Sequence, residues 1–135
     1  MSVGTFDPNQ LHAQAKPIDG QLRQQAVEIA QRQATGAGQL DLSDDEVSDL
    51  QPLLTHSGWF EAAQELSMAD VVGLIRLFTL GEGQFSGWQA GAKSPVVALA
   101  KTLKQRREMT PELTAWIKQN TDNRYLPHGD LMDRL

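Results

Sequence analysis

One stretch in the middle of the chain limits the possible folds more than any other. It spans residues 67–80 and reads SMADVVGLIRLFTL. Apolar side chains surround it on a helical projection, and only Asp70, Gly73 and Arg76, at three-residue steps, interrupt them. A helix that is apolar on nearly every side is normally buried, and this one is too short to span a bilayer. We therefore expect a helix over residues 68–80 at the centre of a small helical domain.

The length and amino-acid composition of the chain agree with a single domain and exclude several kinds of chemistry. The chain has 135 residues, the usual size of one domain, and this length supports a core without disulfides or metal. It has no cysteine, which excludes disulfides, thiolate catalysis and cysteine-ligated zinc. The N-terminal sequence lacks the basic start and apolar run of a signal peptide, and no segment resembles a membrane span. We expect a cytoplasmic bacterial protein that does not contact a membrane.

Charge is distributed unevenly along the chain. The net charge is −5, with −8 on residues 1–92 and +3 on residues 93–135. An acidic total disfavours non-specific binding to nucleic acid by the whole surface. The asymmetry marks an interaction surface, or else it reflects two halves that lie side by side and neutralise each other.

Helix start signals divide the rest of the chain. Residues 1–17 have no sustained period and are expected to form a flexible arm, so that residues 18–135 form the domain. The first helix should run from about Asp19 to Ala34. A capping box of Ser43 and Glu46 begins the next helical region, in which Pro52 predicts a kink or a break.

The second half of the chain carries further helix signals. A short helix is expected over residues 59–66, and Gly81 and Gly83 should end the central helix. Ser94-Pro95 and Thr110-Pro111 begin two more helices, because each pairs an N-cap residue with proline at the first helical position. The sequence therefore predicts an all-α domain of five or six short helices.

A glycine-rich loop with two aromatic residues, over residues 81–94, is the least helical part of this half. Its Phe85 and Trp88 either plug the core as part of a structural connector or anchor a partner protein. Burial of Trp88 in the monomer distinguishes the two readings.

The same loop resembles a phosphate-binding loop in spacing only. Gly87, Lys93 and Ser94 are spaced as that motif requires, but Ala92 replaces its second glycine, and no strand precedes it. A true nucleotide loop is disfavoured. A weaker possibility is that Lys93, beside a helix N-terminus, holds a small anion.

A basic helix pair leaves nucleic-acid binding open as an alternative. The helices over residues 95–107 and 111–120 have the lengths of a helix-turn-helix, with cations near the linker. A recognition helix should begin with polar, base-reading residues, whereas this one begins Pro111-Glu112-Leu113. A simple antiparallel hairpin with a basic outer face is the preferred interpretation.

Other polar groups give no catalytic or metal motif. The acidic run over residues 41–49 lacks the ligand spacing of an EF-hand, and the three histidines are far apart in sequence. On the central helix, Asp70 is expected to cap its own helix, and Arg76 to pair with Glu61 or Glu65. We assign no catalytic residue, metal or cofactor.

The leading functional hypothesis is a non-enzymatic protein that binds another protein or a second copy of itself. The expected surface combines the loop over residues 81–94 with the adjacent basic helix. Its candidate residues are Phe85, Trp88, Lys93, Lys101, Lys104 and Arg107. Nucleic-acid binding by the helix pair is the alternative, and small-ligand or phosphate binding by the loop is the third.

Overall fold

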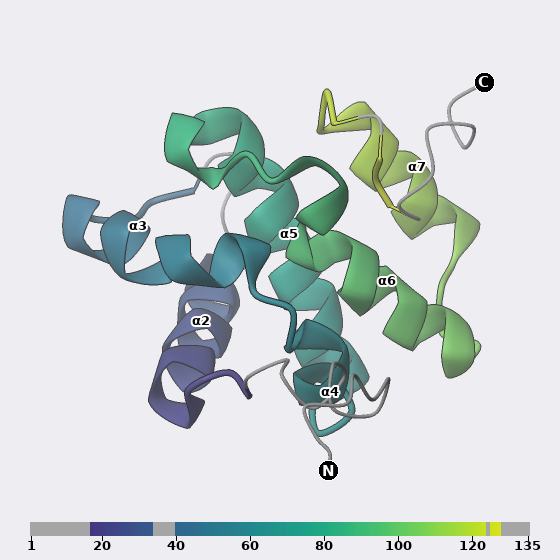
Figure 1. Ribbon diagram of the computed structural model, residues 1–135. Coiled ribbons are helices and arrows are strands. Elements are labelled where there is room, and N and C mark those ends of the chain that lie inside the picture. Colours follow the sequence, from purple (N-terminus) through teal and green to yellow (C-terminus); the bar gives the residue numbers. More distant parts are fainter. Residues whose placement is uncertain (1–16, 34–39, 124, 128–135) are drawn as a thin grey trace, which may run out of the picture.

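The computed structural model describes residues 17–33, 40–123 and 125–127. Within these ranges the chain forms six α-helices and no strand, which confirms the all-α prediction (Figure 1). The α-helices are α2 (Gly20–Gln33), α3 (Asp44–Leu50), α4 (Trp59–Ala63), α5 (Met68–Gln84), α6 (Pro95–Gln105) and α7 (Pro111–Gln119). Three 3₁₀ turns connect them, namely η1 (Gln51–Thr55), η2 (Ser86–Trp88) and η3 (Gly91–Lys93). The predicted arm over residues 1–17 lies almost entirely outside the described residues.

Helix α5 is the centre of the fold, as its composition predicts. It packs mainly against α2 and α6, and its buried residues include Leu74, Ile75 and Phe78. The Phe78 ring lies between two buried indoles, with centroids 5.3 Å from Trp59 and 6.0 Å from Trp88. Aromatic pairs in such tilted or edge-to-face arrangements add to the stabilisation from burial alone.

The helix starts follow the predicted capping chemistry. Ser43 and Glu46 form the reciprocal capping box, in which the Glu46 amide donates to Ser43 Oγ at 3.1 Å. Ser67 caps α5 by accepting from the Asp70 amide, and Thr110 caps α7 by accepting from the Leu113 amide, both at 3.1 Å. Each cap satisfies a backbone donor that a helix start leaves free.

Pro52 breaks the helix rather than kinking it. Helix α3 ends at Leu50, and Pro52 lies in the first turn of η1, where its missing amide hydrogen costs nothing. The break directs Leu53 and Leu54 into the core.

The prediction that glycines end the central helix is wrong. Helix α5 continues through Gly81 and Gly83 to Gln84. Gly81 is needed for packing instead, because a Cβ there would overlap the six-membered ring of Trp88. No atom lies within 4 Å of the corresponding position at Gly83.

In contrast to α5, two other helices end earlier than predicted. Helix α4 stops at Ala63, and α6 stops at Gln105 in a Schellman motif. In that motif the Glu108 amide donates to the Leu103 carbonyl at 2.8 Å, and the Arg107 amide donates to the Lys104 carbonyl at 3.1 Å. Arg107 takes the left-handed conformation, with φ of 60°.

Arg106 links α6 to the end of α4. Its guanidinium donates to the carbonyl oxygens of Ala63 at 2.7 Å and of Leu66 at 2.9 Å. Ala63 is the last residue of α4 and Leu66 lies beyond it, so their carbonyls lie where a helix leaves acceptors without intrahelical partners. Arg106 therefore holds α4 and α6 together.

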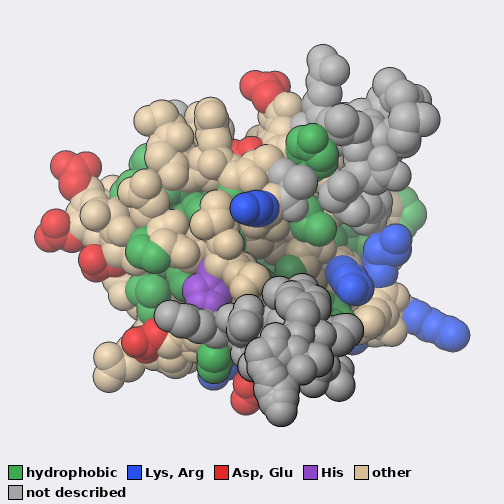
Figure 2. All heavy atoms as spheres, in the orientation of Figure 1, with side chains coloured by type: hydrophobic (Ala, Val, Ile, Leu, Met, Phe, Trp, Pro, Cys, Tyr) green, Lys and Arg blue, Asp and Glu red, His purple; other side chains and the backbone are tan. Residues whose placement is uncertain are grey.

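Charge is segregated in space as well as in sequence. Several acidic side chains lie on the side of the molecule formed by α3, whereas several basic ones gather on the side of α6 (Figure 2). Among the described helices, none has the length and apolar character that crossing a membrane requires.

Candidate binding groove

The central helix keeps an apolar strip that no described element covers. Met68 is 45% exposed, Ala69 is exposed, and Val72 and Leu80 are only half-buried. Helices α2 and α6 cover the other faces of α5. The strip results from a helix that is apolar nearly all round but is packed on only part of its circumference.

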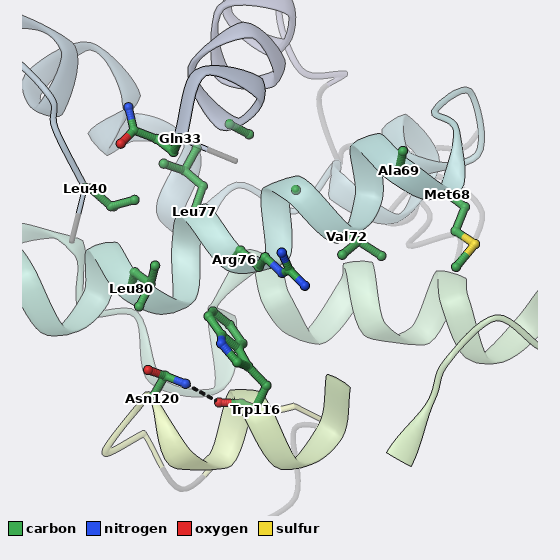
Figure 3. A pocket seen from close by; sticks show the side chains of 12 residues that line it. Gln33, Leu40, Met68, Ala69, Val72, Arg76, Leu77, Leu80, Trp116 and Asn120 are labelled. Carbon is green, nitrogen blue, oxygen red and sulfur yellow. Dashed lines mark hydrogen bonds between the residues drawn. The ribbon is translucent and has the colours of Figure 1, made fainter. Parts of the chain in front are cut away.

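This strip is the floor of a groove of about 470 Å³. Helix α2 contributes to one wall and α7 to the other, with Leu40 near one end (Figure 3). The lining residues are Ala30, Gln33, Leu40, Met68, Ala69, Val72, Gly73, Arg76, Leu77, Leu80, Trp116 and Asn120. Its volume is in the usual range for ligand-binding sites, and its lining is mainly apolar with a few polar groups.

Arg76 and Trp116 face each other across the middle of the groove (Figure 3). The Arg76 guanidinium carbon lies 5.7 Å from the centroid of the Trp116 ring, a distance at which a cation is attracted to an indole face. Arg76 is exposed, and it forms no ion pair with a carboxylate of the described residues.

The polar residues of α5 therefore do not make the contacts expected from the sequence. Glu65, one proposed partner of Arg76, pairs with Arg23 at 3.4 Å. Ser67 caps α5 by accepting from the Asp70 amide, whereas the Asp70 carboxylate, which was expected to cap the same helix, accepts from the Gln31 carboxamide at 3.1 Å instead. Arg76 therefore lies as a cation on the floor of the groove.

Two carboxamides flank one end of the groove. The side-chain Nδ2 of Asn120 donates to the Trp116 carbonyl at 2.7 Å, drawn as a dashed line in Figure 3. The Gln33 side chain forms two hydrogen bonds with the Asp41 backbone. It donates to the carbonyl at 3.2 Å and accepts from the amide at 2.8 Å. These bonds fix both side chains against the backbone.

Of the two aromatic residues of the predicted surface, one is fully buried and the other is half-buried. Trp88 is fully buried, and its indole nitrogen donates to the Val47 carbonyl at 3.1 Å. Phe85 is half-buried, with its ring centroid 5.0 Å from that of Trp88. By the burial criterion, Trp88 acts as a structural plug and has no ring surface to offer a partner.

The predicted cations are exposed but lie outside the groove. Lys101 and Lys104 border a shallow depression of about 350 Å³, and the Lys101 ammonium lies 4.7 Å from the centroid of the Phe60 ring. Lys93 is exposed at the end of η3, and Arg107 is exposed beyond α6. Binding of a protein, a nucleic acid or an anion by these residues stays a prediction.

The loop does not form a phosphate cradle of the kind its spacing suggested. A helix, α5, precedes it instead of a strand, and the loop itself folds into the two short turns η2 and η3. Ser94 is buried and caps α6 by accepting from the Val96 amide at 3.2 Å.

A buried carboxylate lies near the C-terminal end of α5. Glu82 is 7% exposed, and burial raises the pKa of its carboxyl, while a hydrogen bond with Asn123 partly lowers it. Its Oε2 is buried without a hydrogen-bond partner among the described residues. The described residues contain no cluster of three or more potential metal ligands.

The groove itself was missed at the level of sequence. The one signal in the sequence is that Met68, Val72 and Leu80 share the helix with a cation, Arg76, at four-residue steps. The positions of α2 and α7, which turn that strip into a groove, depend on tertiary packing. Comparisons of the chain with protein-family models, with curated proteins and with solved structures found no match.

Proposed function

We propose that this protein is a non-enzymatic binding protein that accepts an α-helical segment of a partner protein in the groove between α2, α5 and α7. The observation that carries the proposal is the uncovered apolar strip of α5, with Met68 as an exposed large hydrophobic residue. Helical domains normally bury such a strip against another helix, because this removes apolar surface from water.

The dimensions of the strip favour a helix as the occupant. From Met68 to Leu80 the floor extends along α5 for about 18 Å, or three helical turns. Packing of an amphipathic helix into an apolar groove is a common mode of peptide recognition, with contacts at every third or fourth residue. Methionine at one end suits this role, because its unbranched side chain adapts to different partners.

Labelled helical peptides provide the test. A panel of amphipathic peptides, with leucines at helical spacing on one face, is titrated with the full chain while fluorescence anisotropy is measured. Ala69→Trp should abolish binding, because the new indole fills an exposed position of the groove. Ala115→Trp is the matched control, since Ala115 is also exposed on a helix but does not line the groove.

Thermal unfolding of both variants confirms that neither substitution disrupts the fold. Equal binding by Ala69→Trp and the wild type would rule out the groove as the site. Absence of binding by every peptide would reject the proposed function.

A further inference from the structure

Arg76 is the one charged side chain among the described residues that line the groove. It lies in the middle of an apolar surface, against the Trp116 ring, and makes no ion pair with a described carboxylate. A helix that packs on Val72 and Leu80 would remove water from the guanidinium. Burial of a charge without a compensating partner is costly, so the occupant must supply an anion.

We propose that the helix bound in the groove is acidic and places an Asp or Glu side chain opposite Arg76. This inference rests on the proposed function and specifies the partner that the groove accepts. The planar guanidinium suits a carboxylate, because it can donate two parallel hydrogen bonds to it. Because the guanidinium already lies against the Trp116 ring, its side chain loses less conformational freedom on binding.

The position of Arg76 along the floor predicts the sequence pattern of the partner. Arg76 lies about 12 Å along the helix from Met68 and about 6 Å from Leu80. The partner should therefore carry two turns of apolar contacts on one side of its acidic residue and one turn on the other. In sequence, apolar residues are expected three or four and seven or eight positions to one side, and three or four positions to the other.

Three matched peptides test this inference. They share leucines at the predicted positions and differ only in the residue opposite Arg76, which is Glu, Gln or Lys. Each peptide is made in both chain directions, because the groove does not fix the polarity of the helix. Wild-type protein should bind the Glu peptide roughly tenfold more tightly than the Gln peptide, as a desolvated charge pair would give.

Substitutions at Arg76 should change this preference in a defined way. Arg76→Gln should bind the Glu and Gln peptides equally, and Arg76→Glu should prefer the Lys peptide. Lys104→Gln removes an exposed cation outside the groove and should retain the wild-type preference. Binding is measured at low and at moderate salt, because a general charge effect would be screened more strongly than a contact pair.

The outcomes separate this inference from the proposed function. If the wild type binds the Glu and Gln peptides equally and Arg76→Gln has no effect, the acidic partner is rejected while the groove remains a helix site. If no peptide binds but dodecanoate does, in an Arg76-dependent manner, the ligand is a small amphiphile and both proposals fail. A wild-type dimer that Ala69→Trp dissociates would show that a second copy occupies the groove, which also overturns the acidic partner.

Discussion

Arg107 shows how one residue can limit the stability of a helix end. It is the C′ residue of the Schellman motif after α6, with φ of 60°, where glycine is usual because it has no Cβ. The left-handed conformation costs a residue with a Cβ on the order of 1 kcal/mol.

Replacement of Arg107 by glycine should therefore stabilise the protein. The greater freedom of glycine in the unfolded chain offsets part of the gain, which leaves roughly 0.5 kcal/mol and a small rise in Tm. Thermal unfolding of Arg107→Gly measures the effect. Arg107→Ala removes the same charge but keeps the strain, so an equal rise in both variants would assign the gain to charge instead.

Glu82 is a second residue whose local environment is unfavourable. Because burial raises the pKa of its folded-state carboxyl, the unfolded chain loses this proton at a lower pH than the folded protein. Stability from this group is therefore complete below the ordinary pKa of about 4.5 and is lost as the pH rises through the folded-state value.

Glu82→Gln should raise the free energy of unfolding at neutral pH by on the order of 1 kcal/mol, because a neutral amide costs less to bury than a carboxylate. The gain should disappear below pH 4.5, where the carboxyl is protonated in both states. Urea unfolding at several pH values measures the difference. A gain that is the same at every pH would show that ionisation of Glu82 is not its cause.

At the scale of the element, two glycines of α5 have opposite roles. Gly81 lies against the ring of Trp88, whereas no atom lies within 4 Å of a Cβ at Gly83. Gly81→Ala should destabilise the protein by roughly 1–3 kcal/mol, because the indole must move out of a packed core. Gly83→Ala should stabilise it by about 0.5 kcal/mol through helix propensity.

Chemical denaturation of the two single variants gives both values. The pair is closely matched, since both residues lie in the last turn of α5 and the substitutions are chemically identical. If the two variants have the same stability, the contact between Gly81 and Trp88 does not constrain the helix.

The same glycines show what sequence reasoning could and could not predict about the elements. Helix starts were predictable because a serine or threonine cap acts on backbone groups only a few residues away, as Ser43, Ser67 and Thr110 do. The end of α5 was not predictable from such local signals. Gly81 is required by its close contact with Trp88, seven residues further along the chain, and does not mark the end of the helix.

At the scale of the whole molecule, the fold class followed from local patterns and the groove did not. Burial of residues around Leu74 and Phe78 was predictable from their apolar surroundings in the sequence. From the sequence, Trp88 could either plug the core or anchor a partner, and its full burial, with the indole nitrogen donating to the Val47 carbonyl, was decided by tertiary packing. Which strip of α5 stays uncovered depends on where α2 and α7 lie, and no local signal encodes that.

The three tryptophans of the chain differ in their surroundings in a way that has a practical consequence. Trp59 and Trp88 are buried in the core, whereas Trp116 is half-buried in the wall of the groove. A quencher dissolved in water therefore reaches one indole well before the other two. The protein carries an intrinsic optical reporter at its proposed site, and the emission of that indole follows occupancy without any added dye.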